Sequence, residues 1–145
     1  MKPAIKAVIA LAAASTTNGA TQTANVDTLG FDHLSLDVCA TTADVVSNKF
    51  SVCKLSESDT TDATNFSDVA KFVAGGAGGF TLASANTSVP YAVKYNVDLT
   101  GRKRYIKVTV SPRTTQTLWA HASLQKAEQS PVIAADAGVN TLVEG

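Results

Sequence analysis

Two histidines, His33 and His121, are the first residues to test for chemistry, because the sequence contains no others. A metal site needs His, Cys or carboxylate side chains that converge on one point. Asp32, His33 and Asp37 fall in or beside one expected strand, where alternate side chains point to opposite faces, and no Cys-x-x-Cys or paired-histidine spacing occurs. The pattern predicts no metal site and favours a histidine at the surface or between subunits.

Nucleophilic and phosphate-binding chemistry also lack their usual sequence signals. Serine, histidine and aspartate are all present, but no Gly-x-Ser-x-Gly turn marks an activated serine. Glu57 and Asp59 lie in an acidic, polar stretch that is typical of a solvated loop. The glycine-rich residues 74–79, AGGAGG, lack the Lys-Ser/Thr pair of a phosphate-binding loop and precede no helical pattern, which favours a tight turn. We therefore expect neither an enzyme nor a bound cofactor.

The two cysteines, Cys39 and Cys53, are too few for a disulfide framework. They fall in neighbouring expected strands and could face each other, so a single bridge is the alternative interpretation. Two half-buried free thiols are the favoured one. Free thiols would imply synthesis in a reducing compartment.

The composition predicts strands and argues against a nucleic-acid partner. Apolar residues make up 45% of the chain but aromatic residues only 6%, because small side chains dominate, with 23 Ala, 18 Thr and 16 Val. Val and Thr have restricted rotamers that suit a pleated sheet. The 12 basic residues balance the 12 acidic ones, and a solvated turn explains the one dense basic cluster, residues 102–104. Near-zero net charge suits a protein that packs densely against copies of itself.

A period of two runs through most of the chain and marks the expected strands. The strongest examples are residues 33–40, 91–98, 105–110 and 117–124. Shorter candidates are residues 20–28, 50–55 and 68–73, and residues 56–65 are expected to be a loop with one helical turn. Short strands joined by Gly, Pro and Asn turns are typical of a β-sandwich or jelly-roll-like antiparallel domain. We expect the last three strong strands to form an antiparallel meander.

Both ends of the chain are predicted to be extended arms of one domain. Residues 1–15 imitate a secretory signal, but the apolar run is only about eight residues long and rich in alanine, at the low edge for a signal core. We therefore predict a strand or docked arm at residues 4–14, a length that also excludes a membrane span. The expected organisation is a single β domain over residues 1–145: an N-terminal strand or arm (1–18), a sandwich core (19–129) and a C-terminal arm (130–145).

Protein contact is the role that the sequence favours for particular side chains. Trp119 is the lone tryptophan, and alternation places it with His121 on the polar face of its strand. Tryptophan is enriched at protein interfaces, although the core of a second sheet is an alternative location for it. We expect contacts in residues 2–18, 56–65 and 130–145. The candidate interface residues are Lys2, Ile5, Lys6, Trp119, His121, Val132, Ile133, Leu142 and Val143.

Five segments with a pattern of strands and turns reach across most of the chain. They are residues 10–19, ALAAASTTNG; 27–37, DTLGFDHLSLD; 54–60, KLSESDT; 91–112, YAVKYNVDLTGRKRYIKVTVSP; and 140–145, NTLVEG. In these segments the chain resembles the small capsid decoration (cement) proteins of tailed bacteriophages. The segments contain no catalytic signature.

The resemblance implies a β-sandwich or jelly-roll protomer, usually a homotrimer, that binds the major capsid protein on the outer surface of the virion at threefold or quasi-threefold positions. Such a protein is made in the host cytoplasm and stabilises the shell mechanically, with no cofactor, no direct nucleic-acid contact and no membrane. Two alternatives stay open. One is another virion component, in the tail or at the head–tail junction, and the other is a secreted β-sandwich binding module.

Overall fold

The computed structural model of the chain describes residues 5–41, 50–83, 90–126, 139 and 141–145. The strands in these ranges are β1 (Ile5–Thr16), β2 (Gln22–Asp27), β3 (His33–Ala40), β4 (Phe50–Ser58), β5 (Ser67–Val73), β6 (Tyr91–Asp98), β7 (Tyr105–Pro112), β8 (Gln116–Gln125) and β9 (Thr141–Glu144). One short 3-10 helix, η1, spans Ala63–Asn65. The expected all-β class is confirmed. None of the described helical residues forms a helix long and apolar enough to cross a membrane.

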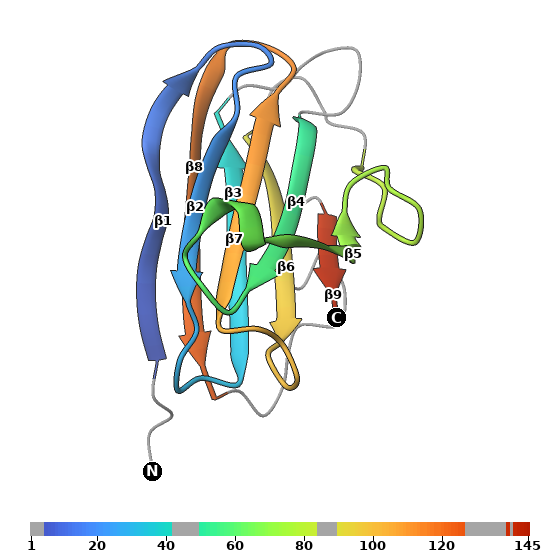
Figure 1. Cartoon of the computed structure of the whole chain (residues 1–145). Helices are drawn as coiled ribbons and strands as arrows, with labels where there is room; N and C mark the ends of the chain where they lie inside the picture. Colours follow the sequence, from blue (N-terminus) through green and yellow to red (C-terminus); the bar gives the residue numbers. More distant parts are fainter. Residues whose placement is uncertain (1–4, 42–49, 84–89, 127–138, 140) are drawn as a thin grey trace.

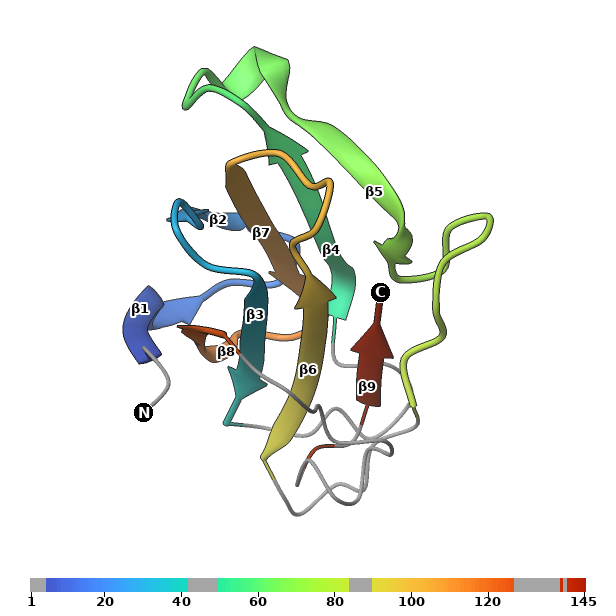
Figure 2. The same ribbon diagram turned by 90° about the horizontal axis from the view of Figure 1, so that it is seen from below.

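The strands form two sheets that pack face to face (Figures 1 and 2). The five-stranded sheet has the order β1-β8-β3-β6-β9, and the four-stranded sheet has the order β2-β7-β4-β5. The antiparallel pairs are nested along the chain: β1 with β8, β2 with β7, β3 with β6, and β4 with β5. A long antiparallel hairpin rolled so that successive pairs fall in opposite sheets is a jelly roll. β9 joins the edge of the five-stranded sheet as a parallel partner of β6.

The expected antiparallel meander of β6, β7 and β8 is wrong. β6 pairs with β3, β7 pairs with β2 and β4, and β8 pairs with β1 and β3, so consecutive strands of this trio are not neighbours. Alternation reports which side chains are buried, whereas the partner strand depends on where each connection leads. Residues 99–104 and 113–115 each cross from one sheet to the other.

The alternation that predicts a strand at residues 33–40 is confirmed side chain by side chain. The core-facing side chains of β3 have 0% exposure; they are Leu34, Leu36, Val38 and Ala40. β4 continues to Ser58 instead of ending at Leu55, because its pairing with β7 continues and buries Ser56 and Ser58. The helical turn expected before Phe66 is η1.

The two cysteines are free thiols, as expected, but they lie in different sheets. Cys39 is half-buried in β3, whereas Cys53 of β4 is buried in the core. The sulfur of Cys53 lies 3.0 Å from the hydroxyl of Tyr95, whose ring packs edge-on against Phe72 and Phe80. Burial raises the pKa of Cys53 to about 12 and that of Cys39 to about 11, so both thiols are protonated at neutral pH.

The glycine-rich residues 74–79 form the expected tight turn after β5. The backbone N–H of Gly75 donates to the carbonyl of Phe80 at 2.9 Å, and that of Gly79 donates to the carbonyl of Gly76 at 3.0 Å. A Cβ atom at Gly79 would overlap the carbonyl oxygen of Val73. The close approach of two backbone segments therefore requires glycine at this position.

Candidate binding surface

The outer face of the five-stranded sheet brings together residues from both ends of the chain. Strand pairing aligns one row across this face: Ile9 of β1, His121 of β8, Asp37 of β3, Lys94 of β6 and Leu142 of β9. The middle of the row is an ion pair, because Lys94 Nζ lies 2.9 Å from Asp37 Oδ1. The two ends of the row are apolar.

β1 bends where it passes the middle of β8. The 12 residues of β1 lie opposite the 10 residues of β8, and the register shifts between Ile9 and Leu11 and again between Leu11 and Ala14. Each shift accommodates one extra residue in β1, which is a β-bulge. The first bulge reverses the alternation, so that Ile9 points outward and Leu11 points into the core.

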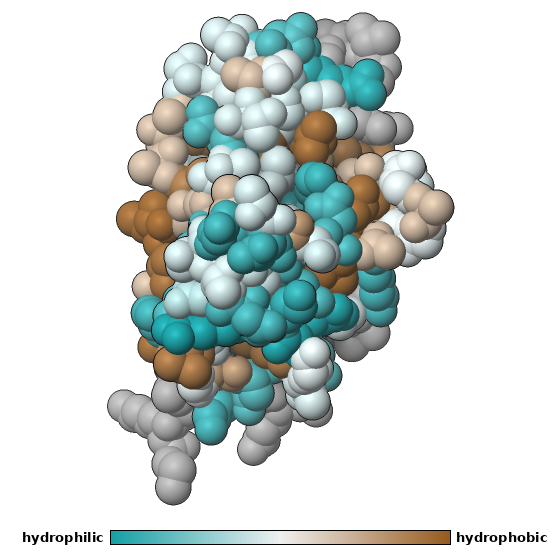
Figure 3. All heavy atoms as spheres, viewed as in Figure 1, coloured by the Kyte–Doolittle hydropathy of each residue, from teal (hydrophilic) through white to brown (hydrophobic). Residues whose placement is uncertain are grey.

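An open groove of about 570 Å³ lies on the outer face beside these bulges, and we call it the β1–β8 groove. Its lining residues are Ile9, Leu11, Ala13, Thr41, Thr117, Trp119, Ala120 and His121. Ile9 is 75% exposed, and Trp119 is half-buried. Apolar residues gather along the flank that β1 forms, whereas hydrophilic residues cover much of the middle of the view (Figure 3).

Two of the predicted interface residues line this groove, and two more lie at the start of β1. Trp119 and His121 line it, on the outer face where the alternation placed them. Ile5 is 62% exposed at the start of β1. Lys6 is exposed in the same strand but lies opposite Leu124, so that it shares the other face of the sheet.

The remaining predicted interface residues lie elsewhere. Lys2, Val132 and Ile133 are outside the described residues. Leu142 is half-buried on the outer face, opposite Lys94. Val143 is 4% exposed and belongs to the core, rather than to the contact surface on which we expected it. The reason is that β9 extends the sheet, so its successive side chains face solvent and core in turn.

Three residues that line the groove from β1 fall within the expected contact range 2–18 but were not singled out as interface residues: Ile9, Leu11 and Ala13. Ile9 could have been found, because it shares the parity of Ile5 in an expected strand. Leu11 and Ala13 could not, because simple alternation along the strand contains no sign of the bulges.

The groove has a mainly apolar lining. Its polar lining consists of Thr41, Thr117 and His121, and His121 is the one titratable side chain among the lining residues. Within the described part of the chain, no three His, Cys, Asp or Glu side chains are grouped so that they could hold a metal ion. The arrangement can enclose an apolar side chain of a partner between Ile9 and Trp119.

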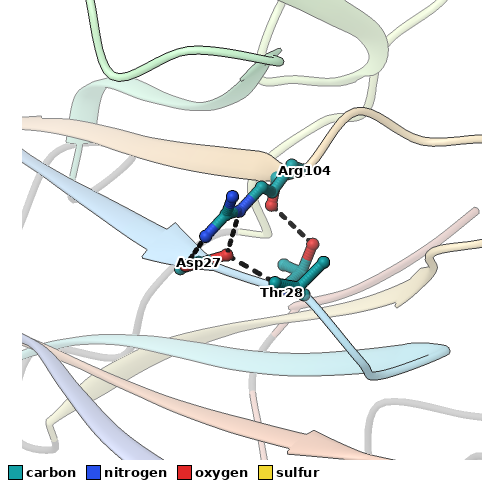
Figure 4. A network of polar contacts seen from close by, with 4 residues as sticks. Asp27, Thr28 and Arg104 are labelled. Atoms are coloured by element: carbon teal, nitrogen blue, oxygen red, sulfur yellow. Dashed lines mark hydrogen bonds and ion pairs between the residues drawn. The ribbon is translucent and has the colours of Figure 1, made fainter.

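Two of the three residues in the basic cluster at 102–104, Arg102 and Arg104, form ion pairs. The guanidinium of Arg104 donates to both carboxylate oxygens of Asp27 at 2.9 and 2.7 Å, and the Thr28 hydroxyl donates to the Arg104 carbonyl at 2.6 Å (Figure 4). The hydrogen bonds from Arg104 lower the pKa of Asp27 to about 2. Arg102 Nη1 lies 3.8 Å from Glu57 Oε1. These pairings reduce the positive charge that the cluster presents to a phosphate group.

The chain matches no protein-family model, and it matches no curated protein sequence. Among solved structures it is similar to a chain in one titled "Structure of infectious bursal disease virus Gx strain", with a TM-score of 0.41 and 10% sequence identity over 90% of this chain. This chain spans only 34% of the length of that one. A likeness this low carries no weight for function.

Proposed function

We propose that this protein is a non-catalytic structural component of a virus particle. Its role would be that of a capsid decoration (cement) protein, which binds the outer surface of the major capsid shell and stabilises it. The observation that carries the proposal is the β1–β8 groove, an apolar surface on a small β domain whose other outer face is largely polar.

The lining of the groove supports a protein partner over a sugar. Trp119 is half-buried and lines the groove together with Ile9 and Ala13, so that the indole is part of a mainly apolar surface. Buried apolar contacts of this kind, with tryptophan among them, carry much of the affinity of protein interfaces. A secreted sugar-binding module would instead present an exposed aromatic platform, which makes that alternative the less supported one.

The jelly-roll fold by itself does not indicate which function the protein has. This architecture occurs in viral capsid proteins, lectins and cupins, and fold alone does not imply function. The resemblance of five segments to phage decoration proteins favours the capsid role, and a net charge of zero suits dense packing on a shell. On the same resemblance the protein would be made in the host cytoplasm and would act as a homotrimer at threefold or quasi-threefold positions.

Binding to shells that lack the protein tests the groove directly. Trp119→Ala should weaken binding to undecorated capsids of the source virus, while Thr23→Ala, at an exposed position of β2 in the other sheet, should leave it unchanged. Far-ultraviolet circular dichroism of both variants controls for folding. If Trp119→Ala and Thr23→Ala bound undecorated capsids equally well, the β1–β8 groove would not be the capsid-binding surface.

Copy number separates decoration from the alternative of a tail or head–tail junction component. Quantitative mass spectrometry of purified particles should find the protein in proportion to the major capsid protein. A copy number that matches a single ring of subunits would instead support a connector.

A further inference from the structure

β1 leaves one side of its backbone available for pairing. It is the edge strand of the five-stranded sheet, and its ladder partner among the described residues is β8 alone. Figures 1 and 2 both place β1 on the outermost flank of the sandwich. From Ile5 to Ile9 the pairing with β8 is regular, and the bulges begin only beyond Ile9. The free edge therefore includes a straight segment of strand, residues 5–9.

This segment has an unusually apolar outer face. The large hydrophobic side chains that are exposed among the described residues are Ile5, Ile9 and Leu29, and two of these three lie here. Ile5, Ala7 and Ile9 all point to the outer face, opposite Gln125, Ser123 and His121 of β8. Edge strands are usually protected from pairing by charged side chains, whereas Lys6 is the one charge in the whole of β1.

We propose that β1 pairs with β1 of a second copy, antiparallel, about a twofold axis that passes between the two copies of Ala7. In this register Ile5 lies opposite Ile9 of the second copy, and Ile9 lies opposite its Ile5. Two isoleucine pairs and a central alanine pair then form a continuous apolar strip on the outer face. The pairing joins two five-stranded sheets across an isologous interface.

The sequence of the segment selects this register over its neighbours. In an antiparallel pair, directly opposite residues share a face, so the central residue must lie opposite its own copy and the axis must pass between the two. An axis at Lys6 would place two ammonium groups opposite each other, which destabilises a pair of strands. An axis at Val8 would pair Ile5 with Leu11, which lies beyond the first bulge. With the axis at Ala7 all five regular residues are paired, and Lys6 lies opposite Val8 of the second copy.

The same symmetry argues for a second copy as the occupant of this edge. The segment IKAVI has isoleucine at equal distances on both sides of its central alanine, so the strand is complementary to itself. A twofold contact gives dimers and even-numbered assemblies, and it does not require the groove to be occupied by a shell protein. The pairing can therefore be tested on the free protein in the absence of capsids, although Ile9 belongs both to the groove and to the paired segment.

Engineered disulfides test both the contact and the register. In a Cys39→Ser background, Ala7→Cys should form a covalent dimer under mild oxidation, because directly opposite residues in adjacent strands have Cα atoms about 4.5–5.5 Å apart, within reach of a disulfide. The control is Ala12→Cys, which is exposed in the same strand but beyond the first bulge, and it should cross-link far more slowly. Cys53 is buried and should not compete.

Sedimentation equilibrium provides the second measurement. The wild-type protein should form dimers, or hexamers if the proposed trimer is present in solution, and Ile9→Lys should halve the mass of the assembly with an unchanged circular dichroism spectrum. A wild-type protein that is only a monomer or only a trimer at the highest soluble concentration would overturn the inference, as would equal cross-linking of Ala7→Cys and Ala12→Cys. Shell binding is measured independently, so a monomer that still decorates capsids would refute the pairing and not the proposed function.

Discussion

The substitution Val143→Ala tests whether the C-terminal strand β9 belongs to the fold or is an arm that makes its contacts outside the domain. The side chain is 4% exposed and lies opposite Tyr95, which is fully buried. Val143→Ala deletes two methyl groups, worth about 1.6 kcal/mol at about 0.8 kcal/mol for each buried carbon. The residual cavity adds to this cost, and we expect a total loss of about 2 kcal/mol in the free energy of unfolding.

The neighbouring residue supplies the matched control. Leu142 lies in the same strand but is half-buried on the outer face, so Leu142→Ala should cost less than about 1 kcal/mol. Urea denaturation followed by tryptophan fluorescence measures both values, and thermal unfolding should show a decrease of about 4–8 °C for Val143→Ala. If the two variants were equally stable, or if Leu142→Ala were the worse, Val143 would not be part of the core and the reasoning from its burial would be refuted.

Three further predictions follow from single sites. Asp27 has its pKa lowered to about 2 from an ordinary value of 3.8, so its pairing with Arg104 stabilises the folded state above about pH 4, and most of this contribution is lost by pH 2. In urea titrations Asp27→Asn should therefore be less stable than wild type at pH 6, and the difference should be much smaller at pH 2. A difference that is constant with pH would contradict the linkage. Burial raises the pKa values of Cys39 and Cys53. Ellman's reagent should therefore react slowly with Cys39 in the native protein, and it should react with Cys53 only after denaturation. Rapid labelling of two thiols in the native protein would be inconsistent with this burial. Gly79→Ala should destabilise the protein by more than about 2 kcal/mol because its Cβ would overlap backbone; a stability within error of wild type would show that the turn relaxes.

Local patterns in the sequence were sufficient for several elements. The alternation in residues 33–40 identified both the strand and the four side chains that it buries. It also placed Trp119 and His121 on the outer face of β8, where they line the groove. The two free thiols and the tight turn at residues 74–79 were likewise predictable, because they depend on residue type and nearest neighbours.

Features that depend on distant parts of the chain were not predictable. The meander expected for β6, β7 and β8 failed because the connections between these strands cross to the opposite sheet. The bulges beside Leu11 are likewise invisible in an alternating run of small apolar residues, yet they shape the groove.

The sequence by itself determined that the chain is all-β and which side of most strands is apolar, because a period of two is a local property that any strand pairing must respect. Only the tertiary structure decided which strands are neighbours, that Val143 is core, and that Ile9 lies beside Trp119 at the edge of the sheet. The physical reason is that strand partners are selected by burial of the whole apolar surface between two sheets, a condition that involves all the strands of the described residues together.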